Sequence, residues 1–164
     1  VAEFLVFNPA IVGGLLIGTG VLLLFSEAWA KRHPDKKDIT LKSSILMAIA
    51  QGLAALPGFS RSGLTIATGL LSGSDRTTSA RYSFLLSIPI ILGASMVYPL
   101  VKLDFAEVIT YNWTAIIAGT IVSGIVGYLC IKYFLKFVSK FSLGIFGYYC
   151  LIMGVVTAVF FSIN

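Results

Sequence analysis

The sequence predicts an all-α integral membrane protein with about four transmembrane helices and one re-entrant helix–loop–helix. Composition is the first reason: 57% of the residues are hydrophobic and only 12% are charged, whereas soluble domains average about 25% charged residues. The second reason is that several apolar runs reach the ~20 residues that a helix needs to span a bilayer, without the alternation of a β-barrel strand. The third reason is that the charges gather in short loops, where they set orientation rather than indicate nucleic-acid binding.

The first span covers about residues 9–30. It carries small residues at every fourth position, the spacing that lets another helix pack closely: Ala10, Gly14 and Gly18. The polar loop 31–42 follows and holds the only histidine, His33. Beside a proline in a charged loop, this histidine is better explained as a solvated residue than as a metal ligand or a catalytic base.

Three further spans are predicted in the second half of the chain, at about 82–101, 113–134 and 143–161. The second of these has another small-residue face, formed by Gly119, Ser123 and Gly127. Cys130 and Cys150 both lie in apolar runs, where small buried residues are a better interpretation than a disulfide.

Loop charges decide how region 43–71 is folded. The lysine-rich loops 31–42 and 132–140 are predicted to be cytoplasmic, while 102–112, with one lysine against two carboxylates, is predicted to be outside. If 43–71 crossed the membrane once, loops 102–112 and 132–140 would both lie on the wrong side. If it dips in and returns, every loop agrees, so we predict a re-entrant hairpin with "PGFSRSG" at its tip.

Non-helical backbone at membrane depth is tolerated only where protein or a water-filled cavity surrounds it. Half-helices that meet near the midplane build polar sites in inverted-repeat membrane proteins. The sequence shows one such hairpin and no second copy of the tip motif. We therefore interpret 1–164 as a single membrane domain, half of an inverted-repeat architecture and the C-terminal part of a longer protein.

The chemistry of the tip points to an anion. Arg61 within the bilayer would be costly without a partner or a polar cavity, and its planar fork suits phosphate. The second half-helix is predicted to begin at about Ser62 or Gly63, so that its free N–H groups and positive dipole end face the tip. Gly58 and Gly63 allow close backbone approach. Further hydroxyl donors are Ser60, Ser62 and Thr65.

Other interpretations stay open for these residues. Arg61 could pair with a carboxylate on another helix, and one of the hydroxyls could simply cap the half-helix. Gln51, two turns before the tip, suits a polar network at the site and a helix–helix hydrogen bond equally well. Asp75 and Arg76 are interpreted as a solvated turn.

At this point the sequence resembles a known family. "QGLAALPGFSRSGLTIATGLLSG" followed by "ARYSFLLSIP" is similar to the second signature region of bacterial undecaprenyl pyrophosphate phosphatases, the bacitracin-resistance phosphatases. The family pattern Pro-Gly-x-Ser-Arg-Ser-x-x-Thr is met in full by Pro57, Gly58, Ser60, Arg61, Ser62 and Thr65. The resemblance covers only the C-terminal part of the family's usual length.

The resemblance implies a hydrolase of the bacterial inner membrane that removes the terminal phosphate of undecaprenyl pyrophosphate and recycles the lipid carrier for peptidoglycan synthesis. It implies that Arg61 and Ser60 are catalytic. The residues that it implies bind or shape the substrate site are Gly58, Ser62, Gly63, Thr65 and, as a network member, Gln51. It also implies a divalent cation, Mg²⁺ or Ca²⁺.

The chain departs from the family in one respect. The other family signature, a glutamate-rich region running into Pro-x-Ser-Ser-Thr-Gly-His, is absent here. We therefore expect no metal ligands on this chain and expect them in a missing N-terminal part, without which 1–164 is inactive. The expected partners are a polyprenyl pyrophosphate lipid, the bilayer and that N-terminal part; a homodimer is left open.

Two other function classes fit the same features. An anion or lipid-phosphate transporter would also use a re-entrant hairpin and a midplane anion site. A non-catalytic membrane scaffold would use Arg61 as an ion pair. Phosphate release from a lipid pyrophosphate, as against flux without hydrolysis, separates the enzyme from the transporter.

Overall fold

The computed structural model describes residues 9–33, 38–102 and 112–163, and within them the chain forms six helices. Four are long and apolar enough to cross a membrane. They are α2 (Pro9–Arg32), α5 (Arg76–Lys102), α7 (Trp113–Lys140) and α8 (Gly144–Ile163). The prediction of an all-α membrane protein with four spans is confirmed.

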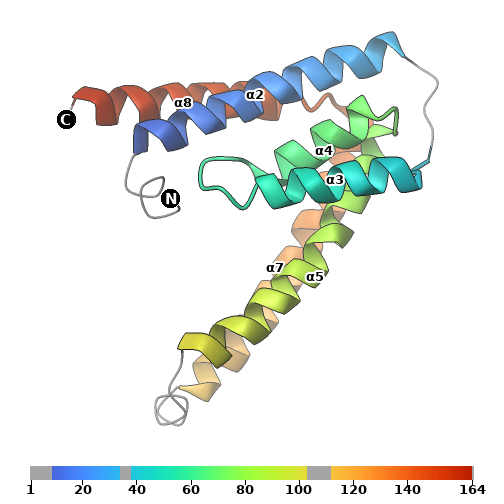
Figure 1. Ribbon diagram of the computed structural model, residues 1–164. Coiled ribbons are helices and arrows are strands. Elements are labelled where there is room, and N and C mark those ends of the chain that lie inside the picture. The colour runs from blue at the N-terminus through green and yellow to red at the C-terminus, as the bar shows by residue number, and fades with distance from the viewer. Residues whose placement is uncertain (1–8, 34–37, 103–111, 164) are drawn as a thin grey trace.

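Two short helices, α3 (Leu41–Leu53) and α4 (Arg61–Leu71), form the hairpin. Thr40 starts α3 with a capping box, in which its backbone N–H donates to the Ser43 hydroxyl over 2.8 Å. The chain then turns at 54–60 and runs back alongside α3 (Figure 1). At 13 and 11 residues, neither helix reaches the length of a span.

Helix α4 is the central element of the fold. It packs against α2, α3 and α5, and seven of its residues are buried: Gly63, Leu64, Thr65, Ile66, Ala67, Gly69 and Leu70. It ends at Ser72, where Gly73 adopts a φ of 85° that glycine tolerates without strain. Asp75 then starts α5 by accepting a hydrogen bond from the Thr77 N–H over 2.9 Å.

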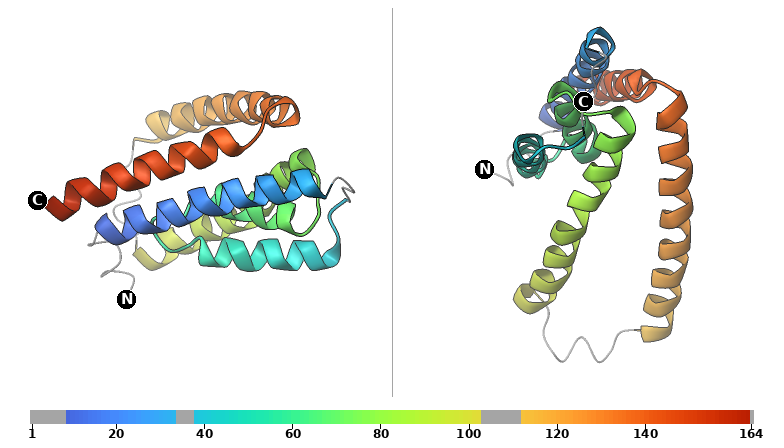
Figure 2. Two further views of the ribbon diagram at one scale, coloured as in Figure 1. Left: turned by 90° about the horizontal axis from the view of Figure 1, so that it is seen from above. Right: turned by 90° about the vertical axis from the view of Figure 1, so that its right-hand side faces the viewer.

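Helices α2 and α8 lie side by side and antiparallel (Figure 2). A Cβ atom on Gly13 would lie 2.7 Å from the Gly154 carbonyl oxygen, and one on Gly20 would lie 2.8 Å from that of Gly147. The contact therefore depends on two glycines on each helix, seven residues apart along the chain: Gly13 and Gly20 on α2, and Gly147 and Gly154 on α8. The predicted face of Ala10, Gly14 and Gly18 is not the one that packs against α8, because Gly14 and Gly18 are exposed and a Cβ atom on either would meet no other described atom within 4 Å.

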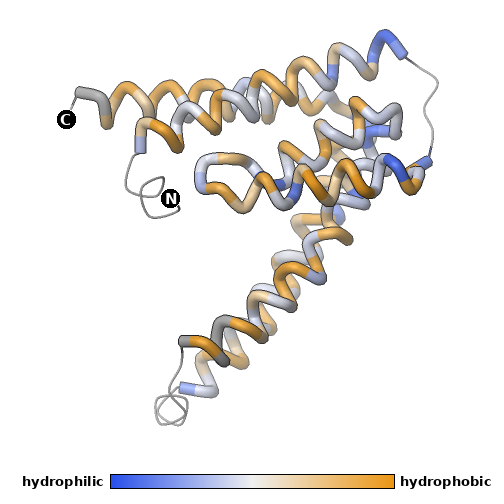
Figure 3. The backbone as a smooth tube through the Cα atoms, in the orientation of Figure 1, coloured by the Kyte–Doolittle hydropathy of each residue, from blue (hydrophilic) through white to orange (hydrophobic). Residues whose placement is uncertain are grey.

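The end of α2, the turn between α4 and α5 and the turn between α7 and α8 gather at one end of the fold. The core cluster there joins α2, α4, α5, α7 and the start of α8, with Ala30, Ile66, Leu70, Ala80, Val138 and Leu143. Hydrophilic segments mark the end of α2 and the start of α3 (Figure 3). The basic stretch 132–140, predicted as a loop, instead continues α7 as helix to Lys140. The loop predicted at 102–112 lies almost entirely outside the described residues.

Helices α5 and α7 form a second antiparallel pair that leans away from the other four (Figures 1 and 2). They meet at their basic ends, where the Phe84 and Phe134 rings pack edge to face with centroids 5.5 Å apart. Toward the other end, both helices expose mostly apolar side chains, as expected for surfaces that face lipid or another part of the protein.

Candidate anion site at the hairpin tip

The loop 54–60 brings the hairpin tip against the first half of α2. Gly58 has a φ of 105°, which a side chain would strain. A Cβ atom there would also lie 2.7 Å from the Val12 carbonyl oxygen. Glycine is therefore required for both its dihedral and its size. Helix α3 ends at Leu53, before the predicted break at Pro57.

The start of α4 is fixed by two hydroxyl groups. Ser60 is the N-cap, and its Oγ accepts a hydrogen bond from the Gly63 N–H over 3.3 Å. The Ser60 N–H in turn donates to Thr19 Oγ1 on α2 over 3.3 Å. Thr19 is fully buried, and Gly63 has no room for a side chain, since a Cβ would lie 2.8 Å from the Thr19 methyl carbon. The helix thus begins one residue earlier than predicted, at Arg61.

The tip lies at the depth of the middle of α2. Its contacts are with Val12 and Thr19, whereas the basic end of α2 is at Lys31 and Arg32. Thr19 is thus 13 residues before Arg32, which corresponds to roughly 20 Å along a helix. The chain therefore turns back well inside the length of its first span.

A cavity of about 250 Å³ lies beside the tip. Ser60, Ser62 and Gly63 line its polar end, and apolar side chains from α2, α4, α7 and α8 line the rest. Those side chains include Leu16, Leu23, Ile66, Phe134, Leu143 and Phe146. A polar end beside an apolar wall suits an amphiphile better than a small inorganic ion.

Several hydrogen-bond donors at the tip have no acceptor among the described residues. Backbone N–H groups at the first two helical positions, Arg61 and Ser62, have no intrahelical partner. Among the described residues the Arg61 guanidinium, which is partly exposed, also makes no ion pair or hydrogen bond. The described carboxylate that is most buried, Glu27, pairs with Arg76 instead. This arrangement favours the anion-binding interpretation of Arg61 over the ion-pair interpretation.

Two of the residues predicted to bind substrate make other contacts. The Thr65 hydroxyl is fully buried, donates to the Arg61 carbonyl and lies 2.6 Å from Ser83 Oγ on α5. Gln51 is buried against α5, where its Nε2 donates to the Leu86 carbonyl oxygen over 2.8 Å. Its Oε1 has no partner in the described part of the chain. Ser60, Ser62 and Gly63 are brought together at the cavity, whereas Thr65 and Gln51 fasten the hairpin to α5.

The buried pair of Glu27 and Arg76 was missed by the sequence reasoning. Arg76 is not part of a solvated turn: its Nε donates to Glu27 Oε2 over 3.2 Å and its Nη2 to Oε1. The signal was available, because an ionisable residue inside an apolar span calls for a partner. Thr19 was also missed, and a hydroxyl in an apolar helix gives no comparable signal.

The described residues form a multi-pass helical membrane protein with a half-helix whose N-terminus lies beside a cavity of mixed polarity. The comparison with known families gives a more specific assignment. The model of the family described as bacitracin resistance protein BacA matches residues 1–156, so the chain belongs to that family, as the resemblance predicted.

Curated relatives agree with this assignment. Proteins named undecaprenyl-diphosphatase from Methanosphaera stadtmanae and Halothermothrix orenii are each 42% identical over 90% of this chain, which aligns with 52% and 57% of their lengths. Undecaprenyl-diphosphatase 2 of Stutzerimonas stutzeri is 42% identical over 94% of the chain and 58% of its own length. The chain thus spans about half the length of the curated relatives that it matches.

Proposed function

We propose that the protein to which this chain belongs hydrolyses undecaprenyl pyrophosphate to undecaprenyl phosphate and inorganic phosphate. Water supplies the oxygen that joins the terminal phosphorus, and the bridging P–O bond breaks. The relatives' names support this activity. The observation that carries it to this chain is the N-terminus of α4, where Ser60, Ser62 and Gly63 line a cavity of mixed polarity and the Arg61 guanidinium has no partner among the described residues.

The role proposed for this chain is to bind the pyrophosphate and stabilise its charge. Phosphoryl transfer depends mainly on positioning and on electrostatic stabilisation. Arg61 supplies a bidentate fork, and the Arg61 and Ser62 N–H groups supply the positive end of the α4 dipole. The Ser60 hydroxyl uses a lone pair to accept from Gly63, so its own proton stays available to a phosphate oxygen.

A divalent cation cannot be assigned to the described residues. Within them, no three His, Cys, Asp or Glu side chains lie close enough to hold a metal ion together, and Glu27 is taken by Arg76. We derive no step through a metal on this chain. The proposal places Mg²⁺ or Ca²⁺ ligands in the remaining half of the protein, together with the nucleophile or base, and expects residues 1–164 alone to be inactive.

The proposed setting is the bacterial inner membrane, where the product would re-enter peptidoglycan synthesis and lower the sensitivity of the cell to bacitracin. The four apolar spans support a multi-pass membrane location, and the family description supports the link to bacitracin.

The test is phosphate release from undecaprenyl pyrophosphate by the full-length protein. Arg61→Lys keeps the charge but loses the bidentate fork, and we expect kcat/KM to fall by ~10²–10³, the range for loss of one charge-stabilising donor. Arg32→Lys, the same change at an exposed residue that ends α2, should leave turnover unchanged. Near-normal turnover of Arg61→Lys would remove the assigned role, and substrate flux without hydrolysis would favour the transporter.

A further inference from the structure

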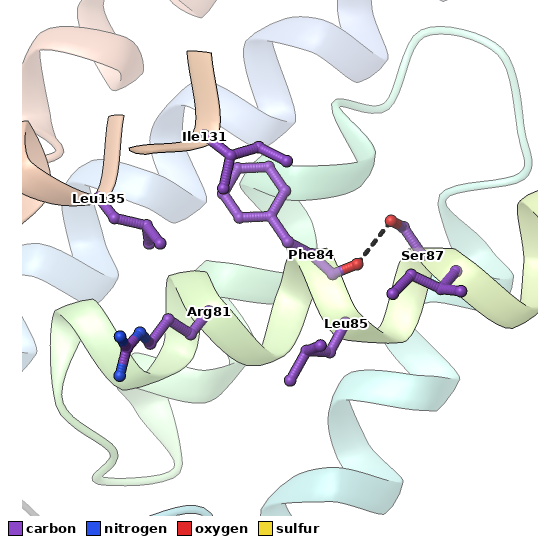
Figure 4. Close-up of a pocket in the computed structure, with 7 residues that line it drawn as sticks. Arg81, Phe84, Leu85, Ser87, Ile131 and Leu135 are labelled. Carbon is purple, nitrogen blue, oxygen red and sulfur yellow. Dashed lines mark hydrogen bonds between the residues drawn. The ribbon is translucent and has the colours of Figure 1, made fainter. Parts of the chain in front are cut away.

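An apolar groove lies between α5 and α7, outside the tip site. It has a volume of about 450 Å³ and is lined by Phe84, Leu85 and Ile88 of α5 and by Ile131 and Leu135 of α7. Figure 4 shows Ile131 packed over the Phe84 ring and Leu85 on the other side of the helix. Because this part of the molecule is long and apolar enough to span a membrane, a groove of this kind faces lipid or the rest of the protein rather than water.

The groove has a cationic end. Arg81 lines it, and its side chain extends away from the Phe84 ring (Figure 4). In the described part of the chain the guanidinium is exposed and has no carboxylate or carbonyl partner. Arg81 lies five residues into α5, which places it roughly 7–8 Å along the helix from its basic end. This is where an arginine at the edge of a span meets headgroups.

The charges around Arg81 favour an anion. No acidic side chain lines the groove, and Ser87, its one hydroxyl, donates to the Phe84 carbonyl oxygen over 2.6 Å. The basic half of α7 adds positive charge at the same end with Lys132, Lys136 and Lys140. Basic pockets between transmembrane helices suit anionic lipid headgroups.

A second hollow adjoins the first. It measures about 490 Å³, is lined by apolar contacts from Leu129 to Phe134 of α7, and shares Phe84 and Ile131 with the first groove. Arg81 lines the first hollow and not the second. One cation at an apolar surface with two adjoining hollows suits the single phosphate and two acyl chains of a glycerophospholipid, and suits a single polyprenyl chain less well.

We propose that this surface is a binding site for an anionic glycerophospholipid of the membrane. The phosphate is held by Arg81, and one acyl chain lies in each of the two hollows that share Phe84 and Ile131. The second hollow shares Phe134 with the cavity at the hairpin tip, whereas Arg81 and the first groove lie outside that cavity. The proposal does not depend on the hydrolase activity.

The test uses the full-length protein extracted from vesicles of equal phosphatidylglycerol and phosphatidylcholine, with retained lipid counted by native mass spectrometry. Arg81→Gln should lower phosphatidylglycerol retention about fivefold, which corresponds to about 1 kcal/mol for one arginine near an anionic headgroup. Arg81→Lys should keep most of it. Lys140→Gln removes the same charge at the same end from a residue outside both hollows and should have little effect. Leu135→Trp fills the groove and should displace both lipids.

Several results would overturn the proposal. Unchanged retention in Arg81→Gln would remove the headgroup site, and equal losses in Arg81→Gln and Lys140→Gln would reduce it to a general surface charge. If Leu135→Trp left lipid retention unchanged and altered the oligomeric state or the thermal midpoint, protein rather than lipid would cover the groove. Stronger displacement of phosphatidylglycerol by a polyprenyl phosphate than by phosphatidylglycerol itself would assign the site to the substrate lipid.

Discussion

The buried pair of Glu27 and Arg76 should contribute strongly to stability, because it joins three segments that are distant in sequence. Glu27 lies on α2, Arg76 starts α5, and Arg76 Nη1 also donates to the Phe141 carbonyl oxygen over 3.4 Å, in the turn before α8. The perturbation is Glu27→Leu, which removes the carboxylate and leaves the guanidinium with only its long hydrogen bond to the Phe141 carbonyl oxygen among the described contacts.

The magnitude follows from the burial of the two side chains. The Arg76 side chain is 19% exposed and the Glu27 side chain is 5% exposed, so solvent screening of the pair is limited. Removing one partner of a buried pair costs about 3–5 kcal/mol, and we take the lower end because Arg76 keeps some contact with solvent. A loss of about 3 kcal/mol lowers the thermal midpoint by roughly 6–12 °C at ~2–4 °C per kcal/mol.

The assay is thermal unfolding of the full-length protein in detergent for Glu27→Leu, Arg76→Met and the double variant. Replacing both charges by apolar residues of similar volume is often close to neutral, so the double variant should be more stable than Glu27→Leu. If Glu27→Leu lowered the midpoint by less than about 2 °C, or if the two single losses added in the double variant, the pair would not couple these segments.

Three further changes test the packing and the tip by the same measurement. Gly20→Val should lower the midpoint by several degrees because its Cβ would lie 2.8 Å from an α8 carbonyl oxygen, whereas Gly18→Val, with open space around it, should change it little; equal effects would contradict the glycine-mediated contact. Gly58→Ala and Gly73→Ala should each cost about 1–2 kcal/mol for their positive φ, and Gly58→Ala should cost more because of the α2 backbone 2.7 Å away. Thr65→Val should lower the free energy of unfolding by about 1–3 kcal/mol, because the buried Ser83 hydroxyl on α5 loses its partner, and Thr65→Ser should lower it less. If Thr65→Val instead raised KM and left the midpoint unchanged, Thr65 would contact substrate rather than hold α4 to α5.

The hairpin could be predicted because two independent signals agree on it. Pro57 and Gly58 break the helix at the point where the structure turns. The loop charges indicate how often the chain crosses the membrane, because a single crossing by 43–71 would have placed two loops on the wrong side. Both signals are local in sequence, so they could be evaluated without knowledge of packing.

Helix packing faces could not be predicted in the same way. The first span offers overlapping sets of small residues, and the set with four-residue spacing, Gly14 and Gly18, faces open space while Gly13 and Gly20 face α8. Lipid and a partner helix are equally apolar, so hydropathy does not distinguish the two sides of such a helix. The choice depends on where α8 lies, which local sequence does not contain.

The residues of the candidate site could be predicted from the motif. Which of them line the cavity and which contact neighbouring helices could not. A serine before a half-helix can cap it, bind an anion or do both, and Ser60 shows that the cap is made while a proton remains free. Thr65 matches the same motif, yet its hydroxyl contacts α5. One helical turn separates these two residues, and only the position of α5 decides which of them faces the cavity.

These contacts together hold a short hairpin in place around the proposed anion site. A donor stabilises developing charge best when it does not need to reorganise. The tip is held to α2 through Thr19 and Gly58, and α4 is held to α5 through Thr65. At the basic end the Glu27–Arg76 pair fixes α2 to α5. The N-terminus of α4 is therefore held on two sides by groups other than the donors proposed to bind phosphate, and those donors, Arg61 and the first N–H groups, have no other partner among the described residues.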